Sequence, residues 1–413
     1  AVLAYAAEHA AEMADDFVQI DQAMRWGFNW DLGPFELWDF LGVGEVVNAL
    51  AAKQQPVPDL VARLIDAGEE RFYGDATGST NAFPPASLKR ESQQQVAGGF
   101  ELLDPDRAAW SNEGAYLVEL DADIGALVFS GKMNALGPAA LAAVHHVVDQ
   151  APFAGLVLCG AGALFSVGAD LKYVAGLVKA EDWPGLDAFV ANFQKAVQAL
   201  RQAPFPVVAA VRGLALGGGC EFSLGADARV AAAELRMGLV ETKVGLIPGS
   251  GGCMELARRK ADAIEIAFAT IFAGQFSDNA FQAQAWGLLG SEDEILLGED
   301  LLLKRAAAKA RELLASGYAG GEVGSVPVTG DQGLELLHRD IEDRLANGLI
   351  SAHDAVVGRG LARVLAGGGG AARELAASAM LDLDREVFLE LCATESTRQR
   401  IDHMLKTGKP LKN

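Results

Sequence analysis

A strand-like segment followed by a glycine-rich corner constrains this chain more than any other feature. Residues 204–225 read PFPVVAAVRGLALGGGCEFSLG. The apolar run predicts a buried strand, and the three glycines that follow allow a tight turn into a helix. Buried strands that alternate with helices are typical of α/β proteins with a largely parallel sheet. The expected fold class is therefore α/β.

The same alternation begins near residue 115. We expect paired strands at YLVEL and GALVFSG, a helix at LGPAALAAVHHVVDQA, a buried strand at GLVLCG, and short strands at ARVAAA and LRMGL. Beyond about residue 262 helices dominate, with a loop at ASGYAGGEVGSVPVTGDQG and a break at LAGGGGAARE. The closing residues DREVFLELCATESTRQRIDHMLKTGKPLKN are predicted to form one long helix and a basic tail.

Changes in composition divide the chain into four parts. Residues 1–73 are predicted to be a small helical unit, since three tryptophans fall within DFVQIDQAMRWGFNWDLGPFELWDFLG. Residues 74–112 have the small and polar composition of a linker, with a functional loop as the alternative. The α/β part takes residues 113–315, and residues 316–413 form a C-terminal helical region.

Composition and charge exclude several classes of protein. Hydrophobic residues make up 51% of the 413 residues, which indicates a globular chain. The net charge of −21 argues against a nucleic-acid-binding surface, although a local basic spot can still hold a phosphorylated small molecule. The sequence contains no run of 18 or more apolar residues, so no membrane span is expected. Four cysteines without a C-x-x-C pair favour free thiols in a reducing cytoplasm.

The chain opens without a methionine and in what reads as the middle of a helix, so we expect it to be the C-terminal portion of a longer protein. No metal site is expected, because the six histidines are scattered and the adjacent pair, His145 and His146, would point to different faces of a helix. The GxG spacing in CGAGALF lacks the third glycine and the downstream acidic residue of a dinucleotide-binding corner. A self-sufficient NAD oxidoreductase is therefore not expected.

Two glutamates stand in small or apolar surroundings beside glycine-rich turns. Glu221 follows GGG, and Glu241 precedes the turn in MGLVETKVGLIPGSGG. A buried carboxylate is costly unless it is paired, hydrogen-bonded or protonated. If the two meet in space, one can activate a water molecule while the other, its pKa raised by burial, delivers a proton. For each residue taken alone, an ordinary tightly packed glycine turn is the alternative.

Backbone N–H groups at two glycine corners are candidates for an oxyanion hole. The corners are LFSVGADLKYV and GLALGGG, and the donors would be Ala169 and Gly218, each worth about 3 kcal/mol to a developing enolate. A side chain at Gly218 would crowd the ligand, whereas Gly219 is expected to tolerate alanine better. Lys172 is either an ordinary surface charge or a contact to a phosphate or an adenine.

Together these stretches resemble the crotonase (enoyl-CoA hydratase/isomerase) family over roughly residues 115–314. The resemblance is carried by FSVGADLKY, PFPVVAAVRGLALGGGCEFSLGADARVA and MGLVETKVGLIPGSGG, in the order and spacing of the family. It implies a ββα superhelix with flanking all-α segments and an acyl-CoA thioester substrate, without cofactor or metal. It also implies the site residues: catalytic Glu221 and Glu241, an oxyanion hole at Ala169 and Gly218, and CoA contacts at Asn134, Asp170, Leu171 and Lys172. GKMNALG replaces the usual Arg-Pro-containing loop near the CoA adenine, a departure from the family pattern.

The flanking segments carry a second resemblance. IDQAMRWGFNWDLGPFELWDFLG is similar to the C-terminal helical domain of 3-hydroxyacyl-CoA dehydrogenases. LCATESTRQRIDHMLKTGKPLKN is similar to the tail of bacterial fusions that carry the dehydrogenase first and the hydratase second. The resemblance implies that NAD belongs to a dehydrogenase domain outside this chain, so these residues hold no complete dehydrogenase site. It is compatible with a homo-oligomer and with a thiolase partner.

The reaction expected from the resemblance is syn addition of water to a trans-2-enoyl-CoA, giving a 3-hydroxyacyl-CoA in fatty acid β-oxidation. Glu241 would protonate the α-carbon and Glu221 would help to activate the same water. Family members that keep only one glutamate tend to be isomerases, so the presence of both favours hydration. The alternatives are a Δ3,Δ2-enoyl-CoA isomerase and a non-catalytic CoA-binding assembly subunit.

Overall fold

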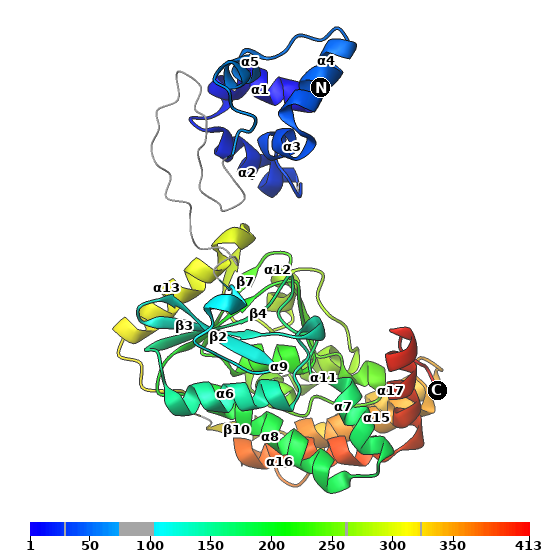
Figure 1. Ribbon diagram of the computed structural model, residues 1–413. Helices are drawn as coiled ribbons and strands as arrows, with labels where there is room; N and C mark the ends of the chain where they lie inside the picture. The colour runs from blue at the N-terminus through cyan, green and yellow to red at the C-terminus, as the bar shows by residue number, and fades with distance from the viewer. Residues whose placement is uncertain (29, 74–102, 261–262, 323) are drawn as a thin grey trace. The chain divides into compact units, whose positions relative to one another are not determined.

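The computed structural model divides into two compact units, residues 1–97 and 98–413 (Figure 1). It describes residues 1–28, 30–73, 103–260, 263–322 and 324–413. The predicted linker covers residues 74–112, and most of it, residues 74–102, lies outside the described residues. The part of that predicted segment that is described contains a short 3-10 turn, Pro105–Arg107, and a strand, β1 (Trp110–Ser111), which pairs with the sheet.

The first unit is helical, as its composition predicts. Its described helices are α1 (Val2–Met13), α2 (Phe17–Phe28), α3 (Pro34–Leu41), α4 (Val43–Ala52) and α5 (Asp59–Asp66). Its core is aromatic, with Phe17, Phe35, Trp38 and Phe72 fully buried. The carboxylate of Asp21 accepts hydrogen bonds from the backbone N–H groups of Phe35 and Glu36, and so satisfies two donors in the first turn of α3.

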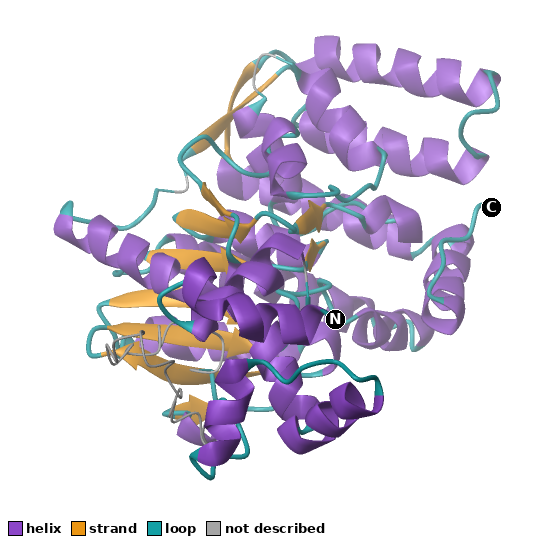
Figure 2. Cartoon of the chain, turned by 90° about the horizontal axis from the view of Figure 1, so that it is seen from above, coloured by secondary structure: helices purple, strands orange, loops and turns teal. Residues whose placement is uncertain are grey.

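The second unit is built around a seven-stranded sheet in the order β1-β2-β3-β4-β5-β7-β9. Its first three strands pair antiparallel and the rest pair parallel, so the α/β prediction is confirmed. Figure 2 shows the strands as neighbouring arrows. Their bounds are β2 (Ala115–Asp121), β3 (Ile124–Phe129), β4 (Gly155–Gly160), β5 (Val207–Val211), β7 (Ala228–Ala232) and β9 (Glu294–Leu296).

The central strands are apolar throughout because helices cover both faces of the sheet. Successive residues of β4 point to opposite faces: Leu156 and Leu158 join one hydrophobic core, and Val157 and Cys159 join the other. Helix α13 (Leu302–Ala315) packs on the second core, and α6, α8 and α9 pack on the first (Figure 1). Those three helices span Pro138–Gln150, Trp183–Arg201 and Gly218–Gly225.

The second unit also contains a small separate sheet and several shorter elements. A parallel pair, β6 (Leu214–Leu216) and β8 (Arg236–Gly238), stands beside the main sheet. Further helices of this region are α7 (Leu171–Lys179), α10 (Gly252–Arg259), α11 (Ile264–Phe272) and α12 (Ala280–Ala285). Its 3-10 turns include η3 (Lys132–Asn134), η4 (Glu241–Val244) and η5 (Glu299–Leu301). In the part of the chain that the structure describes, no helix is long and apolar enough to cross a membrane.

The C-terminal residues belong to the same compact unit as the sheet. Two sequence predictions for this part are wrong. The segment expected to be a loop contains β10 (Ser325–Val328), which pairs antiparallel with β11 (Arg373–Ala376) just after the glycine break. The single closing helix is two helices, because Thr394 adopts an extended backbone and caps the second through its side chain. The helices here are α14 (Gly330–Ala346), α15 (Ala352–Leu365), α16 (Ala377–Cys392) and α17 (Glu395–Thr407).

Candidate active site

A cavity of about 1150 Å³ lies at the carboxyl ends of the parallel strands. Segments that follow β3, β4 and β6 line it, which is where open parallel sheets bind their ligands. The turn η4 and the helices α16 and α17 add further walls. The lining includes Ala169, Gly218, Glu221 and Glu241, so the structure brings these four predicted residues to one cavity.

Two glycines with positive φ direct the candidate oxyanion donors. Gly168 has φ +100° and Gly217 has φ +52°, and the N–H groups of Ala169 and Gly218 follow them. Neither N–H has a hydrogen-bond acceptor among the described residues. A Cβ atom placed on Gly218 would lie 3.1 Å from the nitrogen of Ala169, so the two backbones approach closely. The corner therefore offers two adjacent, unpaired donors to a ligand.

Glu221 lies in the first turn of α9 and is 3% exposed. Its Oε1 atom accepts hydrogen bonds from the backbone N–H groups of Ser250 (2.7 Å) and Gly252 (2.9 Å). Both donors stand at the N-terminus of α10, where the helix dipole also favours a negative charge. Burial raises the pKa of Glu221 to about 7, and the two hydrogen bonds oppose that rise.

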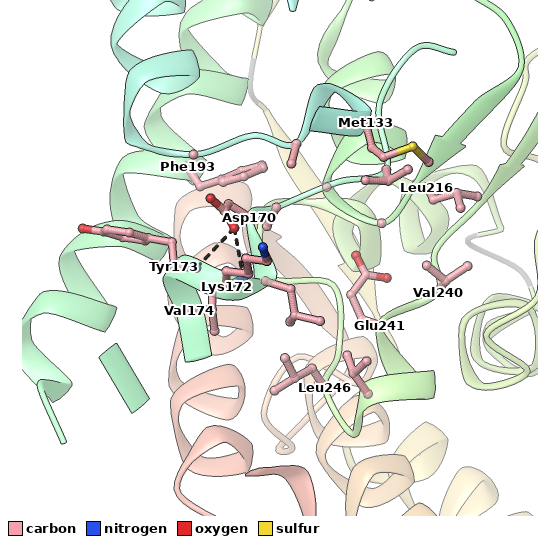
Figure 3. A pocket seen from close by; sticks show the side chains of 18 of the residues that line it. Met133, Asp170, Lys172, Tyr173, Val174, Phe193, Leu216, Val240, Glu241 and Leu246 are labelled. Carbon is pink, nitrogen blue, oxygen red and sulfur yellow. Dashed lines mark hydrogen bonds between the residues drawn. The ribbon is translucent and has the colours of Figure 1, made fainter. Parts of the chain in front are cut away.

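Glu241 begins η4, and neither of its carboxylate oxygens has a hydrogen-bond partner among the described residues. Figure 3 shows this carboxylate among Leu216, Val240 and Leu246. A Cβ atom on Gly217 would lie 3.2 Å from its Oε1 atom, which places the carboxylate beside the corner that holds the two candidate donors. Burial raises the pKa of Glu241 well above its ordinary value, and the charges of Glu221 and Asp384 raise it further. Burial and these neighbouring charges therefore favour the protonated form of Glu241 over the ionised form.

The predicted CoA contacts do not all occupy the cavity. Asp170, Leu171 and Lys172 line it at the start of α7, where the Asp170 carboxylate accepts from the backbone N–H groups of Lys172 (2.9 Å) and Tyr173 (3.2 Å) (Figure 3). Asn134 has a different place. Its side chain is buried and donates to the backbone carbonyls of Ala161 (2.8 Å) and Leu164 (2.9 Å), so it braces a loop.

The space around Gly219 does not support the expectation that alanine there is milder than a side chain at Gly218. A Cβ atom at Gly219 would lie 2.6 Å from the backbone oxygen of Ser166, closer than real Cβ contacts allow. Ser166 is itself fixed, because its hydroxyl donates to the Asn134 carbonyl (2.8 Å) and accepts from the N–H of Gly168 (3.1 Å). The glycine at position 219 thus allows the two corners to pack directly on each other.

Sequence reasoning missed the part that the C-terminal helices play. Phe388, Met404 and Leu405 line the cavity from α16 and α17. Gln194 is a buried polar residue on α8, and its side chain donates to the backbone carbonyls of Gly249 (2.8 Å) and Leu381 (2.7 Å). The signal available in the sequence was a glutamine next to Phe193 on the apolar face of that helix.

Residues 131–319 match the sequence model of the family described as enoyl-CoA hydratase/isomerase. The crystal structure of an enoyl-CoA hydratase from Bacillus halodurans covers 70% of this chain and 99% of its own, with a TM-score of 0.50 and 17% identity. At that identity the likeness concerns the fold alone, and the expected crotonase-like architecture with flanking helices is confirmed.

Two curated relatives extend the match. A probable 3-hydroxyacyl-CoA dehydrogenase of Bacillus subtilis (strain 168) is 34% identical over 422 aligned positions, which cover 100% of this chain and 54% of that protein. The mitochondrial methylglutaconyl-CoA hydratase of Mus musculus is 37% identical over 173 positions, which cover 42% of this chain and 52% of that protein. The chain thus spans about half the length of the curated relatives it matches.

Proposed function

We propose that the cavity catalyses syn addition of water to a trans-2-enoyl-CoA, giving a 3-hydroxyacyl-CoA. One observation carries the proposal: two unpaired backbone donors share a cavity with two buried carboxyl groups in opposite environments. One carboxylate is stabilised by two N–H groups, and the other has no partner that would favour its ionised form. Such a pair supplies a base and an acid at the same pH.

In this proposal the thioester oxygen accepts hydrogen bonds from the N–H groups of Ala169 and Gly218. Negative charge builds on that oxygen as the water oxygen bonds to the β-carbon, and each donor stabilises it by about 3 kcal/mol. Glu221, ionised, takes a proton from the attacking water. Glu241, neutral at the start, delivers its proton to the α-carbon. Transfer of the water-derived proton from Glu221 to Glu241 then restores the starting protonation states.

Local charge supports a phosphorylated ligand despite the net charge of −21. Three lysines line the cavity, and the first two of them are exposed: Lys132, Lys172 and Lys243. Ammonium groups at such positions can pair with the phosphates of CoA. The apolar side chains of Phe189, Phe193 and Leu246 line the same cavity and suit an acyl chain.

The same proposal covers the longer protein. Residues 1–73 would be the helical part of a NAD-dependent 3-hydroxyacyl-CoA dehydrogenase, residues 113–315 the hydratase domain, and residues 316–413 a helical region that completes the cavity. Dehydrogenation would then oxidise the product of hydration, so the two activities would be consecutive steps of fatty acid β-oxidation. A cytoplasmic location, a homo-oligomer and a thiolase partner are further parts of this proposal.

The test is hydration of crotonyl-CoA, followed as loss of the absorbance of the conjugated thioester. The expected result is turnover by the purified chain without added metal or NAD. A 3-enoyl-CoA supplied instead would gain that absorbance if the chain were an isomerase. Binding of CoA without turnover of either substrate would identify a non-catalytic assembly subunit and overturn the proposal.

A further inference from the structure

A single peptide group connects Glu241 to the C-terminal helices. The carbonyl of Gly245 accepts a hydrogen bond from the Thr397 hydroxyl on α17 at 2.9 Å. The N–H of Leu246 donates to the backbone carbonyl of Glu241 at 3.1 Å. The carbonyl of Gly245 and the N–H of Leu246 belong to one planar unit, so a bond that fixes one end also fixes the direction of the other.

The Thr397 hydroxyl is itself oriented by His353 on α15. The His353 Nε2 atom lies 2.8 Å from Thr397 Oγ1. A threonine hydroxyl has one proton, and here it is donated to Gly245, so the imidazole Nε2–H must be the donor to the hydroxyl oxygen. Both side chains are buried, Thr397 completely. Burial and the nearby Arg400 charge lower the pKa of His353, which favours the neutral ring.

Only glycine permits this approach at position 245. Gly245 has φ +79°, and a Cβ atom there would lie 2.7 Å from Thr397 Oγ1 and 3.1 Å from His353 Nε2. Arg400, one turn after Thr397, donates to Asp354 Oδ1 at 2.7 Å and to Ser351 Oγ at 3.1 Å, at the start of α15. Helices α15 and α17 are thereby joined directly behind the turn.

The connection matters because the Glu241 side chain has no hydrogen bond of its own to hold it. Its carboxyl group is positioned by packing and by the backbone from which it extends. A misplacement of about 1 Å in a reacting group can lower a rate by about 100-fold. A residue that fixes this backbone therefore affects the proton donor without contacting a substrate.

We propose that Thr397, oriented by His353, is a positioning residue for Glu241. The inference rests on the proposed hydration and adds to it a determinant outside residues 131–319, the segment that matches the family. It assigns to α17 a part in proton delivery in addition to lining the cavity.

The test compares substitutions of Thr397 in crotonyl-CoA hydration by the full chain. Thr397→Val keeps the shape and removes the hydroxyl, and kcat should fall about 10- to 100-fold while KM changes less than about twofold. Thr397→Ser keeps the donor and should recover at least about half of the wild-type kcat. Thr407→Val is the matched control on the same helix, because that hydroxyl is exposed and bonds back to the His403 carbonyl. It should leave both parameters unchanged.

A second variant protects the test against a folding defect. His353→Leu leaves the Thr397 hydroxyl in place but removes its orienting donor, and kcat should fall about 3- to 10-fold. Thr397→Val and Thr407→Val with equal kcat would overturn the inference, as would a loss that Thr397→Ser fails to recover. An inactive wild-type chain would overturn the proposed hydration, and the inference with it; an active wild type with unaffected variants would overturn the inference alone.

Discussion

Glu221 and Glu241 are each held by a turn in which a side chain from a distant helix donates to a glycine carbonyl. The two turns differ in the atom of the glutamate that the next backbone N–H contacts. Behind Glu221, the Gly249 carbonyl accepts from Gln194 and the N–H of the next residue, Ser250, donates to the carboxylate itself. Behind Glu241, the Gly245 carbonyl accepts from Thr397 and the next N–H donates only to the backbone carbonyl of the glutamate. In each turn one peptide group is thus fixed by a hydrogen bond at its carbonyl, but only the turn behind Glu221 donates an N–H to a carboxylate oxygen.

This difference in hydrogen bonding acts on the pKa values of the two glutamate carboxyl groups. Hydrogen bonds to a carboxylate favour its charged form, whereas burial without them favours the neutral acid. The pKa of Glu221 is accordingly raised only to about 7, and that of Glu241 is raised well beyond its ordinary range. In the proposed mechanism, the environment of each glutamate rather than its residue type would decide which one is the base and which one the acid.

The largest expected effect comes from removing either carboxyl group. Glu221→Gln and Glu241→Gln should each lower kcat for crotonyl-CoA hydration by about 10² to 10⁴. The double variant should be little worse than the poorer single one, because the pair acts on one water. In the wild type, kcat/KM should fall as the pH drops through about 7, since Glu221 takes up a proton there and can no longer act as a base.

Near-wild-type turnover in either variant would show that the corresponding turn holds no catalytic group. If kcat/KM of Glu221→Gln still fell as the pH dropped through about 7, the group that titrates there would be another residue. CoA binding and the melting temperature of each variant, measured alongside, separate a chemical defect from a folding defect.

The next effect concerns the oxyanion corner that both glutamates adjoin. A Cβ atom at Gly218 would lie 2.7 Å from the Phe193 ring and 3.1 Å from the nitrogen of Ala169. Gly218→Val should therefore lower kcat by about 10² to 10³, more than it raises KM, because it displaces one donor to the developing enolate.

Gly176→Ala provides a matched glycine control on α7, where a Cβ atom would meet nothing within 4 Å. It should retain full activity and gain about 0.4–1 kcal/mol of stability. If Gly218→Val kept its kcat and lost only affinity, this N–H would be a binding contact and the enolate would have another donor.

A smaller effect tests the clamp behind Glu221. Gln194→Leu would remove the side-chain donor that joins the carbonyls of Gly249 and Leu381, and it should lower the free energy of unfolding by about 1–3 kcal/mol. Activity should fall only about 3- to 10-fold, since the N–H of Gly252 still holds the carboxylate. A less well aligned Ser250 N–H stabilises the charge less, so the acid limb of the pH profile should move to higher pH. An acid limb that moves to lower pH would contradict this role.

The local parts of the site could be predicted from sequence because local sequence determines them. The strands before each corner are continuous apolar runs, and the glycines at 168 and 217 stand where the chain needs a positive φ. Both glutamates were found because a charge within a small, apolar segment is conspicuous. Their catalytic roles remain predictions.

What sequence could not predict depends on contacts across the chain. Thr397 meets Gly245 across 152 positions, and Gln194 meets Leu381 across 187. No periodicity within α8 or α17 specifies such a partner, since a buried polar residue on a helix shows only that some partner exists. The break between α16 and α17 was missed for a related reason: a threonine N-cap inside a long helical pattern competes weakly with propensity.

The smallest expected effect on turnover concerns Asp384, a third buried carboxyl group, on α16. It is completely buried, and neither oxygen has a hydrogen-bond partner among the described residues; the neighbouring Cys253 thiol donates to the Pro248 carbonyl at 3.7 Å. Burial raises its pKa well above the ordinary value, and the charge of Glu221 raises it further. Burial thus favours the neutral acid, which an amide resembles, so Asp384→Asn should change kcat by less than about threefold.

Stability, in contrast, should respond to Asp384→Asn in a pH-dependent way. The folded state holds this proton more tightly than the unfolded state, so wild-type stability falls as the pH rises above the ordinary aspartate value. The variant lacks that loss. In urea titrations, its free energy of unfolding relative to wild type should therefore increase as the pH rises above the ordinary pKa of an aspartate. Asp382→Asn, an exposed neighbour paired with Arg385, should show no such increase. A kcat loss in Asp384→Asn as large as that of Glu241→Gln would instead make Asp384 a third member of the acid–base set, and two clamped turns would no longer account for the chemistry.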